Sequence, residues 1–123
     1  MRAAILVTSV LATLAAAPAG ADTRPAAEQA AIDWLLVKIQ TSGAVFIRNE
    51  KEYDGEQAAA HLKSKLWWAG SRVQTARDFV FGIATKSEQS GKLYEVRLVD
   101  GRRMPLRDWL LGLLAEKDKE KPK

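Results

Sequence analysis

The sequence predicts a single small α+β domain of about four helices with a small antiparallel sheet. Several segments repeat apolar residues at the three- and four-residue spacing of one helix face. Shorter segments between them carry β-branched and aromatic residues, which favour strands. One such segment ends at Asp100-Gly101, a dipeptide typical of a tight hairpin turn. Because helical segments outweigh the strand segments, we expect helices to dominate the domain.

The first residues have the pattern of a secretory signal peptide. Arg2 precedes an apolar run that ends in the small residues Ala19-Gly20-Ala21, a site of the type that signal peptidase cuts. We therefore expect a signal peptide over 1–21, cleavage after Ala21, and a periplasmic or secreted protein. No later segment approaches the roughly 18 apolar residues that a membrane span requires, so no span is expected after cleavage.

The remainder divides into three parts by composition. Residues 22–25 read as a linker, 26–115 as the α+β domain, and 116–123 as a charged, disordered tail. Cysteine is absent, which excludes disulfides, thiolate metal ligands and a lipid-modified cysteine. The net charge of +4 is mild, and acidic and basic residues alternate along the chain, so we expect no nucleic-acid partner.

The first predicted helix spans Ala26–Thr41. Its apolar positions follow the spacing of one helix face and are Ile32, Leu35, Leu36 and Ile39. We expect Ser42-Gly43 to end the helix. A short strand follows over Ala44–Arg48, with a turn at Asn49 to Lys51 and a possible return over Glu52-Tyr53. Asn49 suits the turn because asparagine tolerates a positive φ.

Two capping boxes mark the next helices. The first box is formed by Asp54 and Gln57 and begins a helix that ends at Gly70. The second box is formed by Thr75 and Asp78 and begins the next helix. The apolar faces expected for these two helices are Ala58, Leu62, Leu66 and Ala69 in the first, and Ala76, Phe79, Val80 and Ile83 in the second.

The C-terminal third predicts a loop, a hairpin and a helix. The loop covers 87–91, and Tyr94, Val96 and Leu98 then alternate with polar residues as in a half-buried strand. A return strand over 102–104 leads to Pro105, which suits the first turn of a helix. The apolar face of that helix is Leu106, Trp109, Leu110, Leu113 and Leu114.

A set of residues distributed over most of the mature chain resembles a family of small exported bacterial proteins known only as a domain of unknown function. The pattern comprises Phe46-Ile47-Arg48-Asn49, Tyr53, Ala59, His61-Leu62, Lys65, Thr75-Ala76, Phe79, Ile83-Ala84, Lys86-Ser87, Ser90-Gly91, Tyr94 and Trp109-Leu110. The resemblance runs from about Ile32 to Leu114 and implies a periplasmic location, but no activity.

The chain departs from the family pattern at two positions. Relatives typically have glycine where this chain has Glu50, in the expected turn. Relatives also often carry cysteine where this chain has Ala44, so any disulfide those relatives form is absent here.

Five residues form the candidate site for a ligand or partner: Arg48, Tyr53, His61, Lys65 and Trp68. They gather around one strand-to-helix connection, and all but Trp68 belong to the family pattern. A guanidinium fork binds carboxylate or phosphate with two hydrogen bonds, so we expect a non-enzymatic domain for an anionic group or a protein partner. The structural alternatives are a bridge from Arg48 to a nearby acid and an imidazole hydrogen bond from His61. We expect no metal or cofactor.

The alternative function is a small hydrolase acting on cell-wall material, with His61 as acid or base. Catalysis would require a nucleophile or an orienting carboxylate beside the imidazole, and the sequence pairs His61 with neither. Paired-carboxylate chemistry is not expected either, because the acidic residues have roles in turns and helix caps. One of Trp67 and Trp68 must point away from the core, where it could stack on a sugar ring or anchor a partner.

Overall fold

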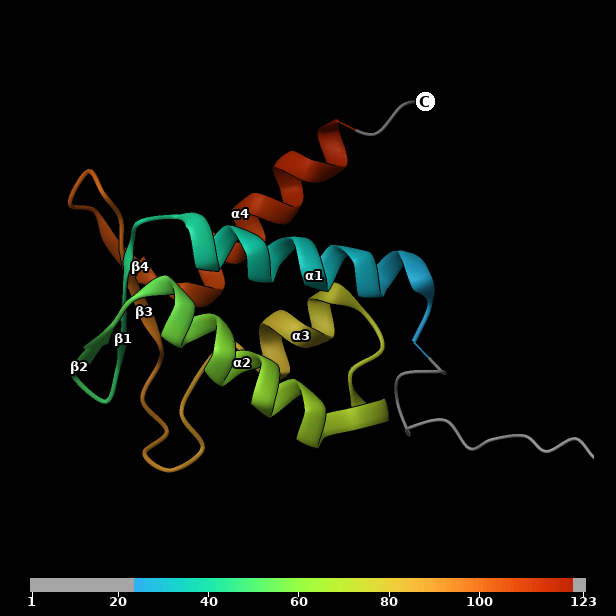
Figure 1. Cartoon of the computed structure of the whole chain (residues 1–123), viewed down its shortest axis with the longest axis horizontal. Helices are drawn as coiled ribbons and strands as arrows, with labels where there is room; N and C mark the ends of the chain where they lie inside the picture. Colours follow the sequence, from blue (N-terminus) through green and yellow to red (C-terminus); the bar gives the residue numbers. More distant parts are fainter. Residues whose placement is uncertain (1–23, 121–123) are drawn as a thin grey trace, which may run out of the picture.

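The computed structural model describes residues 24–120, which form one α+β domain as predicted (Figure 1). The predicted signal peptide over 1–21 lies outside the described residues. The helices in this part of the chain are α1 (Ala26–Thr41), α2 (Gly55–Ala69), η1 (Gly70–Arg72), α3 (Ala76–Gly82) and α4 (Leu106–Lys119). The strands are β1 (Val45–Arg48), β2 (Lys51–Tyr53), β3 (Glu95–Arg97) and β4 (Arg103–Pro105). None of the helices in 24–120 is long and apolar enough to cross a membrane.

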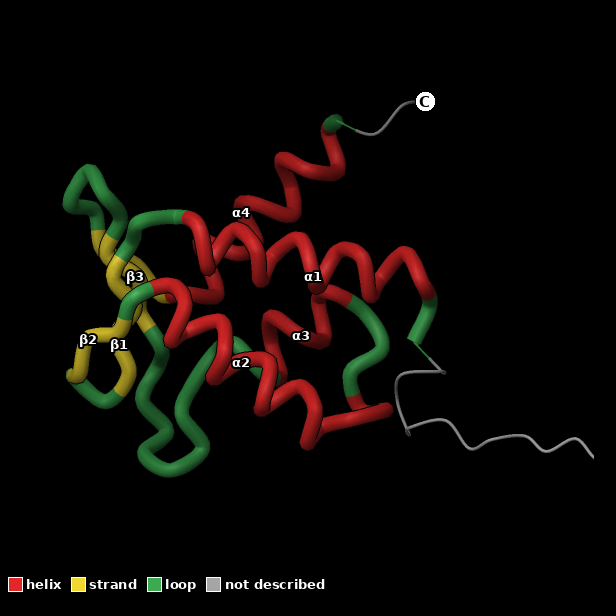
Figure 2. The backbone as a smooth tube through the Cα atoms, in the orientation of Figure 1, coloured by secondary structure: helices red, strands yellow, loops and turns green. Residues whose placement is uncertain are grey.

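The strands form an antiparallel sheet in the order β2-β1-β3-β4. Both hairpins expected from the sequence are present, and β1 joins them by pairing with β3. Figure 2 shows the strands gathered at one end of the molecule, with α1 and α2 extending away from them. The sheet is therefore the place where the N-terminal and C-terminal halves of the described chain meet.

The core lies between the helices and the sheet: α1 packs against α2, α3 and α4, while α2 and α4 contact the strands. All four apolar positions predicted for α1 are buried there. Phe46 on β1 and Val96 on β3 enter the same core, and the Phe46 ring lies 6.0 Å from the Trp109 ring of α4. Because each strand is only three or four residues long, these helix contacts stabilise the sheet.

Side-chain caps begin α2 and α3, as the sequence predicted. Asp54 accepts a hydrogen bond from the Gln57 amide at 2.8 Å, and the Gln57 side chain accepts one from the Asp54 amide at 3.0 Å. Thr75 and Asp78 make the equivalent pair at the start of α3. Each box satisfies backbone amides that the first helical turn leaves free.

The tight approach of α2 to the end of α1 depends on Gly55. A Cβ at this position would lie 2.3 Å from the Ile39 carbonyl oxygen and 2.9 Å from that of Gln40. Glycine therefore allows the first turn of α2 to rest against the backbone of α1.

The structure adds to one expectation and differs from another. Trp67 and Trp68 are both exposed, at 71% and 74%, and contact each other edge to face at 4.9 Å. At about 100° per residue, the core-facing row of Leu62, Leu66 and Ala69 leaves both indoles on the outer side of α2. Helix α4 also continues to Lys119, into the segment expected to be disordered, and the Lys117 ammonium lies 5.0 Å from the Trp34 ring.

We expect Gly55→Ala to destabilise the fold by about 1–3 kcal/mol, because its methyl group would overlap the α1 backbone. Urea unfolding followed by circular dichroism measures this change. The matched control is Gly112→Ala in α4, where a Cβ meets nothing within 4 Å. The control should gain up to about 1 kcal/mol from the better helix propensity of alanine. Equal stability of Gly55→Ala and the native chain would contradict this packing.

Candidate functional site

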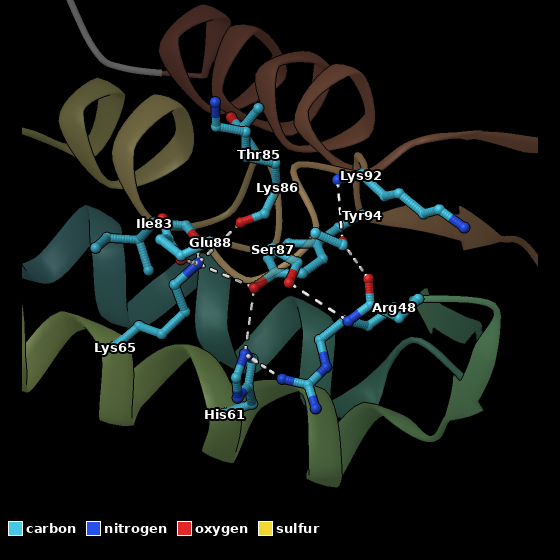
Figure 3. Close-up of polar contacts among 12 residues, drawn as sticks. Arg48, His61, Lys65, Ile83, Thr85, Lys86, Ser87, Glu88, Lys92 and Tyr94 are labelled. Atoms are coloured by element: carbon cyan, nitrogen blue, oxygen red, sulfur yellow. Dashed lines mark hydrogen bonds and ion pairs between the residues drawn. The ribbon is translucent and has the colours of Figure 1, made fainter.

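The Tyr94 hydroxyl is at the centre of a polar cluster that joins α2 to the sheet. Tyr94 immediately precedes β3 and is 5% exposed. Its hydroxyl oxygen lies 2.9 Å from Lys65 Nζ and 3.2 Å from His61 Nε2 (Figure 3). Since an ammonium only donates, Tyr94 accepts a hydrogen bond from Lys65 and directs its own proton towards His61.

Lys65 is held by several oxygens at once. Its ammonium donates to the Ile83 carbonyl at 2.8 Å and the Lys86 carbonyl at 3.1 Å, and forms an ion pair of 2.9 Å with Glu88. The Lys65 side chain is 15% exposed. These contacts fasten α2 to the segment that follows α3, so Lys65 positions Tyr94, and its own charge is already balanced by Glu88.

His61 receives two hydrogen-bond donors on one nitrogen. Arg48 Nη1 lies 3.2 Å from His61 Nε2, the same atom that Tyr94 approaches. A guanidinium cannot accept a hydrogen bond, so Nε2 must carry the lone pair and the imidazole proton must sit on Nδ1. This assignment of the two contacts corresponds to a neutral imidazole.

The electrostatics of the cluster favour that neutral form. Burial lowers the pKa of His61 most, and the positive charges of Arg48 and Lys65 lower it further. Glu88 acts in the opposite direction and raises the pKa, but its effect is smaller. The net shift is below the ordinary value of 6.5, which leaves His61 uncharged at neutral pH.

Arg48 has no carboxylate within ion-pair distance in residues 24–120. Within the described residues, Arg48 does not form the bridge to a nearby acid that was the alternative for it. Its guanidinium instead contacts His61 and lies 5.5 Å from the Tyr53 ring. Arg48 at the end of β1 is thus a half-buried cation held by two uncharged rings.

A cavity of about 160 Å³ lies beside Arg48. It is bounded by β1, the first half of α2 and the start of α4. Its lining residues include Arg48, Tyr53, His61, Phe46, Leu62 and Leu106. The three polar residues are partly exposed, whereas the three apolar ones are buried. The cavity therefore places a cation next to an apolar interior.

The β1–β2 turn and the loop after α3 hold each other in place. Asn49 and Glu50 both have a positive φ, of 52° and 69°. Glu50 thus adopts in this turn a left-handed conformation that glycine adopts most readily. Asn49 hydrogen-bonds Ser87 and Ser90, and Glu50 forms an ion pair of 2.9 Å with Lys92. These contacts support the loop that carries Glu88 and leads to Tyr94.

The structure brings together four of the five predicted site residues. His61 and Lys65 both contact the Tyr94 hydroxyl, Arg48 contacts His61, and Tyr53 packs on Arg48. Trp68 does not line the Arg48 cavity; it lines another hollow, between α2 and α3, which His61 and Lys65 also border. The role of Tyr94 was not predicted: Tyr94 belongs to the family pattern, but the alternation of the strand marked it as a core position and not as a site residue.

The described part of the chain shows no group of three His, Cys, Asp or Glu side chains that could hold a metal ion. His61 also lacks a carboxylate at hydrogen-bond distance in 24–120, since its contacts there are with Arg48 and Tyr94. What the cluster offers is one guanidinium, one neutral imidazole and an adjoining cavity, an arrangement suited to binding.

The fold and the cluster define a small α+β domain in which a polar network joins a helix to a four-stranded sheet within 24–120. The chain belongs to a family of unknown function, DUF5329, whose profile matches residues 26–118. This match confirms the resemblance found in the sequence. The chain is also 34% identical over 90 residues to the uncharacterised protein YfeK of Salmonella typhimurium strain LT2, covering 72% of this chain and 74% of the relative. No solved structure matches the chain.

The neutral state of His61 predicts a pH dependence of stability. Because the pKa of His61 is below 6.5 in the folded chain, the unfolded chain binds more protons as the pH falls through 6.5. The free energy of unfolding should therefore decrease between about pH 7 and the folded pKa, and more steeply than in His61→Gln. Urea unfolding of both chains at pH 7.5 and pH 5.5 measures the difference, and equal slopes would contradict the prediction.

The same shift is directly measurable, because His61 is the one histidine in the sequence. An NMR titration of protein without a histidine tag should place the pKa of His61 below 6.5. In Arg48→Gln the pKa should rise, since a nearby positive charge is removed. The control variant Arg102→Gln changes an arginine paired with Asp100 in the β3–β4 turn and should leave the pKa unchanged.

Proposed function

We propose that this chain is a non-enzymatic binding domain whose Arg48 guanidinium receives an anionic group. The observation that carries the proposal is the absence of a carboxylate partner for Arg48 within 24–120, beside a cavity open to a ligand. Other arginines near the sheet are already paired: Arg97 with Glu52 and Arg103 with Glu95. An anion bound to Arg48 would supply the negative charge that balances its guanidinium.

The surroundings of Arg48 keep its guanidinium available. His61 and Tyr53 hold it from two sides without neutralising it. A guanidinium is planar and offers two parallel donors to a carboxylate or phosphate, so restraining its orientation lowers the entropy cost of binding. Glu88 already pairs with Lys65, so its carboxylate is not free to bind a cation. The cluster thus favours anions over cations.

The same geometry makes the hydrolase alternative less favourable. A general base needs a free lone pair, and the Nε2 lone pair of His61 already faces two donors, from Arg48 and Tyr94. In the described residues no acid orients the imidazole, and the nearest hydroxyl, on Tyr94, is engaged by Lys65. No observation at this site favours hydrolysis over binding.

A protein partner is the second candidate, and the exposure of two adjacent tryptophans favours it. Trp67 and Trp68 form an aromatic surface on α2, the helix that also carries His61 and Lys65. Large aromatic side chains are frequent anchors at protein interfaces. In this version of the proposal, the anionic group on Arg48 would belong to the partner.

An anion that binds Arg48 should raise the pKa of His61, because it offsets the positive charge that disfavours the imidazolium. NMR titrations of His61 in sodium acetate and in sodium chloride of equal ionic strength test this. We expect a higher pKa in acetate for the native chain and for Arg102→Gln, and no difference in Arg48→Gln. Identical titrations of the native chain in the two salts would contradict anion binding at this site.

We also propose that the protein acts in the periplasm or outside the cell, on the basis of the signal pattern in 1–21. Expression of the full chain in a Gram-negative host should yield a periplasmic protein whose N-terminus is Asp22. An Ala21→Arg variant should resist cleavage, because the site requires a small residue. Recovery of the native chain in the cytoplasm with its N-terminal segment intact would contradict export.

A further inference from the structure

The cavity beside Arg48 has a size that limits its occupant. Its volume is about 160 Å³, close to the roughly 150 Å³ of an engineered apolar cavity that binds benzene. Phe46, Leu62 and Leu106 line it, and each is less than 5% exposed. A single six-membered ring or a branched aliphatic group fits such a space.

Polar and apolar groups occupy different depths of the cavity. Gln57 is exposed, and Arg48 and Tyr53 are half-buried, whereas the apolar lining belongs to the core. A ligand that fits both ends carries its charge near the surface and its apolar body inside. Burial of that body would supply binding energy in proportion to its apolar area.

The other polar groups at the cavity are already engaged. Glu95 pairs with Arg103 at 2.8 Å, and the Gln57 side chain caps α2. Neither group is free to receive an ammonium, which argues against an amino acid or an amine. Among the described residues that line the cavity, Arg48 is the charged residue without an ion-pair partner, since Glu95 pairs with Arg103. One positive charge matches a monoanion better than a dianion.

We infer that the cavity binds a small carboxylate with an apolar body about the size of one ring, its carboxylate on Arg48 and its ring among Phe46, Leu62 and Leu106. This inference rests on the proposed function and adds the class of ligand. A carboxylate is planar and accepts two parallel hydrogen bonds from a guanidinium. One molecule then contacts both the charged end and the apolar end of the cavity.

Isothermal titration calorimetry with a matched ligand series tests the inference on the native protein. Phenylacetate should bind roughly tenfold tighter than acetate or more, because its ring is buried. Benzyl alcohol lacks the charge, 2-phenylethylamine reverses it, and 1-naphthaleneacetate exceeds the cavity, so all three should bind more weakly than phenylacetate. All of these measurements use the native protein, so they do not depend on the folding of a variant.

Two variants separate the charge from the cavity. Ala58 lines the cavity on α2, and Ala58→Leu should fill it. We expect this variant to lose at least about tenfold in phenylacetate affinity while acetate still raises the pKa of His61. Arg48→Gln should lose both responses, and Arg102→Gln should keep both.

The outcomes separate the ligand class from the proposed function. Equal affinity for phenylacetate and acetate, or tighter binding of naphthaleneacetate, would overturn the ligand class and leave anion binding at Arg48 intact. Tighter binding of inorganic phosphate than of phenylacetate would overturn it in favour of a phosphate ligand. Absence of any response to acetate, phosphate or phenylacetate would overturn both the ligand class and the proposed function.

Discussion

The arrangement of the cluster depends on the ammonium of Lys65. An ammonium so largely removed from water is stable only when oxygens replace its hydration. Here the oxygens come from distant segments: the Ile83 carbonyl after α3, the Lys86 carbonyl and Glu88 carboxylate of the loop, and the Tyr94 hydroxyl before β3. Because Lys65 itself is on α2, its contacts hold the helix against the chain that enters the sheet, as Figure 3 shows.

The properties of Arg48 follow from this arrangement. Lys65 orients the Tyr94 hydroxyl, and Tyr94 and Arg48 both donate towards Nε2 of His61, which keeps the imidazole neutral. A protonated His61 would place a third positive charge in a cluster whose one acidic contact within 24–120 is Glu88. Arg48 is therefore oriented without being neutralised, and within 24–120 no acidic side chain completes its charge. The network therefore couples the free energy of unfolding to the protonation state of His61.

Features set by local sequence were predictable, and features set by distant contacts were not. The bounds of α1, the two capping boxes and both hairpins depend on residues a few positions apart, and all are confirmed. The gathering of Arg48, His61 and Lys65 was predictable from one strand-to-helix connection. The role of Tyr94 was not, because it depends on a loop that returns the chain to α2. The exposure of both Trp67 and Trp68 depends on where the packing partners of α2 end, which periodicity alone does not show.

A crystal structure of the protein soaked with 4-bromobenzoate tests the central claim most directly. We expect anomalous bromine density inside the cavity, near Phe46 and Leu106, with the carboxylate on the Arg48 guanidinium and His61 still in contact with Tyr94. An Arg48 side chain paired with a carboxylate of its own chain, with no bromine in the cavity, would contradict it.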